Sequence, residues 1–181
     1  IKASNGQSTA QISFFIAVKN ALNITGKLLP GKIVNAHIFF DINANGVLDK
    51  DLEEYTLTDE EGEFSLIIKG NYNQISKVPL LAVIAKGADD LSTNIDDFDN
   101  LPVTLALTPI IHLNQQLDLY QNAYISPLST LLTIESKEII NALYNSSIDI
   151  TQYEQVFASK KDMLANKLTI EPINFEQDYL S

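Results

Sequence analysis

The stretch NAHIFFDINANGVLDKDLEEYTLTDEEGEFSL, residues 35 to 66, alternates apolar runs with acidic segments that each contain one Gly. Runs rich in Phe, Ile, Thr and Leu between such breaks are typical of β-strands. The turn from Asp59 to Gly62 joins two of them as a hairpin, because Asp and Gly accept the backbone geometry of a tight turn. Strands are therefore predicted over residues 35–42, 54–58 and 63–69.

Similar runs lie on both sides of this stretch. They cover residues 10–18, 23–29, 78–86 and 101–112. About seven short strands separated by turn residues predict an antiparallel β-sandwich, with a partly open barrel as the alternative. The fold class expected is mainly β with an α-helical C-terminal region.

Near residue 113 the spacing of the hydrophobic residues changes from a pattern typical of strands toward the 3.6-residue period of helices. Ser126 and Pro127 have the character of a helix N-cap and first helical residue, and Thr151 with Glu154 matches a capping box. Two amphipathic helices are expected. We predict a β-domain over residues 1–112 and a helical region over 113–181, packed on its own sheets or on a neighbouring molecule.

The composition limits the classes of partner. The 181 residues carry a formal charge of −11, include no Cys, and take all 12 basic side chains from Lys. Nucleic acid is disfavoured as a partner, whereas divalent cations are favoured. No apolar run approaches the length needed to cross a bilayer, so no membrane-spanning segment is expected.

The segment after the strand 35–42 matches a calcium loop of the EF-hand type in part. Oxygen donors stand at positions 1, 3, 5 and 9, Gly46 stands at position 6, and a backbone carbonyl is available at position 7. Position 12 is Leu52, where the template has a bidentate acid. The donors in this order are Asp41, Asn43, Asn45, Val47 and Asp49.

A polar turn without metal would use the same residue types, because Asn and Asp bond their own backbone. Residues 41–63, however, contain nine acids and one Lys. This charge density favours a bound cation, and Ca²⁺ fits flexible oxygen ligands better than Mg²⁺ does.

Together with the T-D-x-x-G sequence at residues 58–62, the loop resembles the calcium-associated, collagen-binding-protein-B-like (transthyretin-like) β-sandwich modules of bacterial surface adhesins. LLAVIAKGADDLSTN and ISPLSTLL resemble the strand and "TPLTTLL"-like helix start that follow such modules, so the resemblance covers roughly residues 26–135. It implies an Ig- or transthyretin-like sandwich. It also implies that Glu53, six residues before Asp59, is the acidic ligand, rather than Asp51 or Glu54.

A second acidic stretch spans residues 89–99. Its spacing fits no metal template, so it is a solvated loop, a second cation site, or a loop that folds over and completes the first site. The acids are Asp89, Asp90, Asp96, Asp97 and Asp99.

Neither His37 nor His112 has a catalytic partner at a useful spacing, and no nucleotide-binding, metalloprotease or serine-hydrolase motif occurs. Both histidines are expected in the core or at a strand edge, and the protein is expected not to be an enzyme.

The N-terminal segment STAQISFFIAVKNA, residues 8–21, is β-prone and apolar on both faces. It is either a first strand of the same domain or a strand donated to the next subunit.

The function expected is that of a secreted or cell-surface bacterial structural protein, stabilised by Ca²⁺. It would serve in cell adhesion as an adhesin module or as the subunit of a pilus-like fibre that self-associates. The alternative is a glycan- or peptide-binding module of a larger secreted protein.

Overall fold

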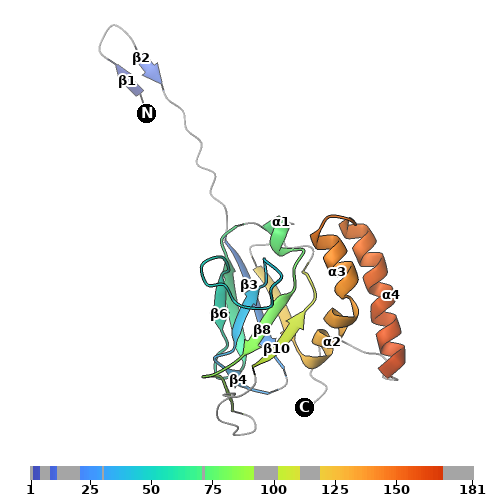
Figure 1. Cartoon of the computed structure of the whole chain (residues 1–181). Coiled ribbons are helices and arrows are strands. Elements are labelled where there is room, and N and C mark those ends of the chain that lie inside the picture. The colour runs from blue at the N-terminus through green and yellow to red at the C-terminus, as the bar shows by residue number, and fades with distance from the viewer. Residues whose placement is uncertain are drawn as a thin grey trace.

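Two β-sheets form the centre of the protein (Figure 1). The computed structural model describes residues 2–4, 9–11, 21–29, 31–70, 72–91, 102–110 and 119–168. Within these residues, one sheet has four strands in the order β10-β8-β5-β6 and the other has three in the order β11-β3-β7. The expected combination of sheets with a helical C-terminal part is therefore confirmed.

The four-stranded sheet is antiparallel throughout. Phe39 belongs to one of the two central strands of this sheet. It pairs with Tyr55 on one side and with Leu81 on the other. The strands are β5 (His37–Phe40), β6 (Tyr55–Leu57), β8 (Leu80–Ile84) and β10 (Val103–Leu107).

The three-stranded sheet mixes directions. β3 (Leu22–Leu28) pairs antiparallel with β7 (Glu63–Ile68) and parallel with β11 (Leu119–Ile125). The prediction of a wholly antiparallel arrangement is thus wrong for this pair. β11 also lies beyond residue 113, so the boundary predicted there does not separate strands from helices.

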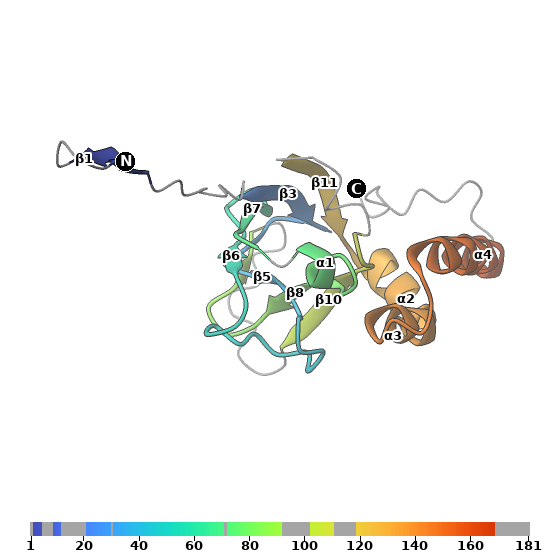
Figure 2. The same cartoon turned by 90° about the horizontal axis from the view of Figure 1, so that it is seen from above.

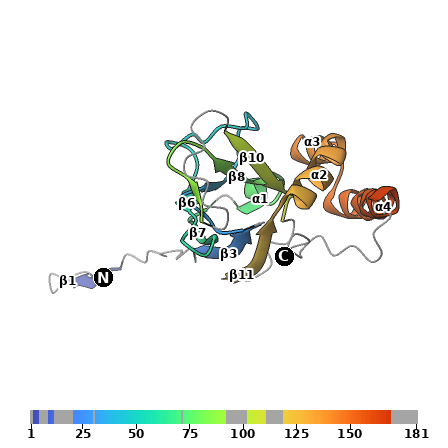
Figure 3. The same ribbon diagram turned by 90° about the horizontal axis from the view of Figure 1, so that it is seen from below.

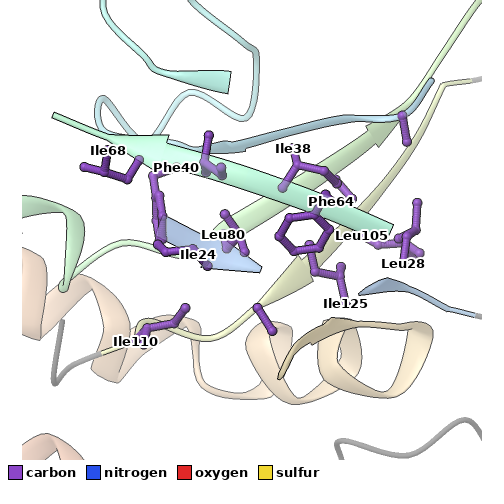
Figure 4. Packing of buried hydrophobic residues seen from close by; sticks show 14 of the residues in the cluster. Ile24, Leu28, Ile38, Phe40, Phe64, Ile68, Leu80, Leu105, Ile110 and Ile125 are labelled. Carbon is purple, nitrogen blue, oxygen red and sulfur yellow. The ribbon is translucent and has the colours of Figure 1, made fainter. Parts of the chain in front are cut away.

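The main hydrophobic core draws its side chains from both sheets (Figure 4). In β7 the buried residues Phe64, Leu66 and Ile68 alternate with exposed ones, as a strand with one face in the core requires. The opposing side chains include Ile38, Phe40, Leu80 and Leu105. A second, smaller cluster of Phe39, Leu81 and Ala106 lies on the other face of the four-stranded sheet.

The remaining described strands and the first helix are short. β4 (Ile33–Val34) pairs with β9 (Asp89–Asp90), and β1 (Lys2–Ser4) pairs with β2 (Thr9–Gln11). The helix α1 (Tyr72–Ile75) is a single turn before β8.

Three helices lie together on one side of the sheets (Figure 2). They are α2 (Pro127–Glu135), α3 (Lys137–Tyr144) and α4 (Ile150–Leu168). The predicted N-cap is confirmed: the Ser126 hydroxyl accepts a hydrogen bond from the Ser129 N–H, and the Ser129 hydroxyl accepts one from the Ser126 N–H.

The helical region differs from the prediction in two details. Ser136 separates α2 from α3, where one continuous helix was expected. At the start of α4, the reciprocal bonds of a capping box join Asp149 and Gln152, two residues before the predicted pair. None of the helices in the described ranges is both long and apolar enough to cross a membrane.

Gly26 allows β3 and β11 to approach closely. A Cβ built on this residue would collide with the Ala123 carbonyl oxygen of β11 and would lie 2.7 Å from Cζ of Phe64. Gly26→Ala should lower the free energy of unfolding by about 2 to 3 kcal/mol, because backbone cannot move aside cheaply. Urea denaturation measures this change.

Gly70→Ala is the matched control for that variant. Nothing lies within 4 Å of its added Cβ, so its free energy of unfolding should change by less than about 0.5 kcal/mol. Equal stability of the two variants would contradict the close approach of β3 and β11.

Candidate metal centre

The predicted calcium loop connects β5 to β6 and folds over the outer face of the four-stranded sheet. Ala44 and Gly46 adopt positive φ angles of 57° and 75°, which turn the chain back. Leu48 then packs on the small cluster that contains Phe39 and Leu81. The loop therefore has two apolar anchors, Leu48 on this cluster and Ile42 on the main core.

Asp41 stands at the end of β5 with its side chain only 7% exposed. Its Oδ1 accepts a hydrogen bond from the Asn45 N–H at 3.0 Å, and its Oδ2 accepts one from the Gly46 N–H at 2.8 Å. The carboxylate thus holds the first turn of the loop.

Glu53 is the second buried acid, with 4% of its side chain exposed. Its Oε1 accepts from the Ile42 N–H at 2.8 Å and its Oε2 accepts from the Asp49 N–H at 2.9 Å. One carboxylate therefore joins the first part of the loop to the last part. Leu52, which occupies position 12 of the template, is 64% exposed and takes no part in this arrangement.

The remaining predicted donors lie nearer to the surface. Each side-chain oxygen accepts the N–H two residues further along: Asn43 from Asn45 at 3.2 Å, Asn45 from Val47 at 2.7 Å, and Asp49 from Asp51 at 3.2 Å. Such local bonds between a side chain and its own backbone stabilise the turns of the loop. Val47 has an exposed side chain.

The chemistry of the predicted ligands fits a cation well, whereas the arrangement of the acidic side chains fits one less well. Every predicted ligand offers oxygen, which suits Ca²⁺. Among the described residues, however, no three acidic or His side chains converge as a metal site. The structure brings Asp41 and Glu53 to the inner side of the same loop and leaves Asn43, Asn45 and Val47 exposed.

The loop is acidic without internal neutralisation. Lys50, its one basic residue, places Nζ 5.2 Å from the centre of the Tyr55 ring. Within the described part of the chain, no Lys forms an ion pair with Asp41 or Glu53. Among the residues that the structure describes, the partners of the two buried carboxylates are backbone N–H groups.

The Ile42 carbonyl connects the loop to the helical region. It accepts a hydrogen bond from the Tyr144 hydroxyl at 3.2 Å and one from the Gln74 side-chain amide at 3.4 Å. A cavity of about 320 Å³ lies between the loop and α2 and α3. Sequence reasoning missed this link, because 102 residues separate Tyr144 from Ile42.

The T-D-x-x-G sequence builds the next turn. The Thr58 hydroxyl is buried and accepts a hydrogen bond from the Ala36 N–H at 2.9 Å. Asp59 Oδ1 accepts from the N–H groups of Glu61 and Glu63, and Gly62 has a φ of 74°. Each fixed position of the motif therefore has a structural role.

The second acidic stretch is only partly described. Asp89 and Asp90 form β9 and pair with Val34 and Ile33 of β4. Asp96, Asp97 and Asp99, like His112 and most of residues 10–18, lie outside the described residues.

Comparisons with protein-family models, with curated proteins and with solved structures find no match to this chain.

His37 is the first residue of the central strand β5 and is half-buried, with its ring centre 5.8 Å from that of Tyr55. Partial burial, and then the positive charge of Lys50, lower the pKa of His37 below its ordinary value of 6.5. The folded state therefore favours the neutral imidazole. Stability from this residue should be present above about pH 6.5 and lost as the pH falls toward the lowered pKa.

The variant His37→Gln tests this pH dependence. Between about pH 7.5 and about pH 5, wild-type protein should lose more free energy of unfolding than the variant does, because only the wild type has to protonate an imidazole on unfolding. Urea denaturation at both pH values measures the difference. A larger loss in the variant would contradict the lowered pKa.

Proposed function

We propose that this chain is a calcium-stabilised structural module of a secreted or cell-surface bacterial protein, either an adhesin module or a fibre subunit. One observation carries the proposal: the loop from Asp41 to Glu53 buries two carboxylates that have no cationic partner in the described residues. Buried charges are costly unless they are paired or bound to metal.

The acceptor capacity of these carboxylates supports cation binding. Each of their four oxygens accepts one backbone N–H, and each oxygen has a further acceptor site. The backbone hydrogen bonds therefore orient the two carboxylates and leave each oxygen able to accept a further partner. The residues that would hold Ca²⁺ are Asp41, Asn43, Asn45, the carbonyl of Val47, Asp49 and Glu53.

Bound Ca²⁺ would supply charge neutralisation and order, not chemistry. With the repulsion between Asp41 and Glu53 cancelled, the loop would hold Leu48 on Phe39 and keep the Ile42 carbonyl in reach of Tyr144. The sheet and the helical region would then be stiffened together, which suits a module that bears mechanical load.

The finer fold assignment is part of the same proposal. Two sheets that share one core, and a turn built by Thr58, Asp59 and Gly62, support an Ig- or transthyretin-like sandwich of the adhesin-module type. An extracellular location agrees with the weak affinity expected of a loop with two Asn ligands, about 10⁻⁴ to 10⁻³ M, because calcium sites of extracellular modules bind in this range.

A glycan- or peptide-binding module is the rival function, and such sites usually expose several aromatic side chains. In the described part of the chain, Tyr55 is the one aromatic residue among the exposed large apolar side chains. This favours the structural role.

A thermal melt in EDTA and in about 10 mM CaCl₂ tests the proposal. At the expected affinity, calcium should stabilise the fold by about 1.4 to 2.7 kcal/mol and raise the midpoint by roughly 3 to 10 °C. An unchanged midpoint would refute calcium binding, and an equal rise in MgCl₂ would refute the choice of ion.

Variants of the loop acids locate the effect. Asp41→Asn and Glu53→Gln should each abolish the calcium-dependent rise, because both remove a buried negative charge from the site. Asp51→Asn is the matched control: its side chain is exposed, so the rise should persist. Loss of the rise in this control would assign the effect to general charge screening.

A further inference from the structure

The loop between β5 and β6 places Asn45 directly before Gly46 on the surface of the molecule. Both residues are exposed, and nothing lies within 4 Å of a Cβ built on Gly46. Figures 2 and 3 show this loop at the margin of the molecule, on the side of the four-stranded sheet remote from β3. Because Gly has no side chain, the Asn45 amide can close a five-membered ring with the next backbone nitrogen without steric hindrance.

The backbone nitrogen of Gly46 is in contact with a base. Its N–H donates to Asp41 Oδ2 at 2.8 Å, a distance at which a carboxylate can take the proton of a nucleophile. The Asp41 side chain is buried, and its other oxygen accepts the Asn45 N–H, so its position is fixed. The nucleophilic nitrogen is therefore held against a proton acceptor.

The side-chain carbonyl of Asn45 is in contact with a donor. Its Oδ1 accepts a hydrogen bond from the Val47 N–H at 2.7 Å. This bond turns the Asn45 side chain back toward the backbone of the two residues that follow it. The same donor would stabilise the negative charge that develops on Oδ1 when a nitrogen attacks the carbonyl carbon.

Asn43 forms the same kind of turn but has neither a following Gly nor a base. Its Oδ1 accepts the Asn45 N–H at 3.2 Å. The next residue is Ala44, whose N–H donates to the backbone carbonyl of Asp41 at 3.3 Å and not to a carboxylate. Within this loop, the combination of nucleophile, base and carbonyl donor therefore belongs to Asn45 and Gly46.

We propose that Asn45 is a self-modification site, at which the loop converts its own side-chain amide to a carboxylate. The Gly46 nitrogen bonds to Cγ of Asn45, and its proton passes to the Asp41 carboxylate. The bond from Cγ to the amide nitrogen then breaks, and this nitrogen takes the proton from Asp41 and leaves as ammonia. Water opens the cyclic imide to give Asp, or its isomer in which the backbone runs through the side chain.

The conversion would change the proposed calcium site. Asn45 is one of the proposed ligands, and Asp in its place would add a carboxylate to those of Asp41, Asp49 and Glu53. The affinity of such loops depends on the charge of their ligands, so the product should bind calcium more tightly. This consequence rests on the proposed function, whereas the conversion itself does not.

Peptide mass spectrometry of the full chain, stored in EDTA at neutral pH and sampled over days, tests the inference. Conversion raises the mass of the peptide that contains Asn45 by about 1 Da, and chromatography separates the two products. The sequence has one further Asn-Gly pair, Asn5 and Gly6, which supplies a reference rate in the same sample. Asn45 should convert while Asn43 stays unchanged. An Asn45 that stays intact would overturn the inference.

Asp41→Asn tests the role of the base. It removes the proton acceptor and keeps the size of the side chain, so conversion of Asn45 should slow by about tenfold or more relative to Asn5. If Asp41 only held the loop closed against reaction, the variant would convert faster, and this result would overturn the inference. Asp51→Asn is the matched control: its side chain is exposed, so the rate should stay within about twofold of wild type. Circular dichroism and the melting midpoint check the fold, and equal slowing in both variants would also overturn the inference.

Asn45→Asp carries the product from the start and separates the two proposals. Its melting midpoint should rise more in CaCl₂ than that of wild type, because the loop then has a further negative ligand. A smaller rise would refute the gain in affinity. Conversion of Asn45 with no effect of calcium on either midpoint would refute the calcium proposal alone. A calcium-dependent midpoint with Asn45 intact after storage would refute the self-modification alone.

Discussion

The paired hydrogen bonds of Glu53 are the constraint on which the outer face of the molecule depends. One buried carboxylate holds the N–H groups of Ile42, near the start of the loop, and of Asp49, in its second half. Hydrogen bonds to an ionised group are among the stronger ones in proteins. They do not remove the charge, and Asp41 adds a second buried carboxylate to the same loop. The local geometry is therefore ordered and electrostatically unfavourable at once, which is the condition that a cation relieves.

Contacts of the loop with the four-stranded sheet and with α3 extend this constraint to other parts of the molecule. Leu48 packs over the cluster of Phe39, Leu81 and Ala106, while the Ile42 carbonyl reaches Tyr144 of α3. Ala106 in turn is bound by Ser129 and Thr130 of α2. Loop, sheet and helices thus form one connected side of the molecule.

Local pattern was sufficient to predict β3, β5, β6, β7, β8 and β10, because each is a short apolar run bounded by turn residues. β11 escaped prediction because LYQNAYI lacks apolar alternation, and its parallel pairing with β3 depends on residues about a hundred positions away. The candidate ligands could be named from spacing through position nine. The proposed closing acid could not be named in this way, because burial, not position in the template, distinguishes Glu53 from Leu52 and Asp51. Only the resemblance to adhesin modules indicated Glu53.

Amide hydrogen exchange, measured by NMR with and without Ca²⁺, tests the role of the two carboxylates most directly. The N–H groups of Ile42, Gly46 and Asp49 donate to Glu53 or Asp41 and should exchange slowly. Added Ca²⁺ should slow them by a further factor of about ten, corresponding to about 1.4 kcal/mol of loop stabilisation. Fast exchange of these amides, or exchange that calcium leaves unchanged while the rest of the fold is protected, would contradict a loop ordered by buried carboxylates and a cation.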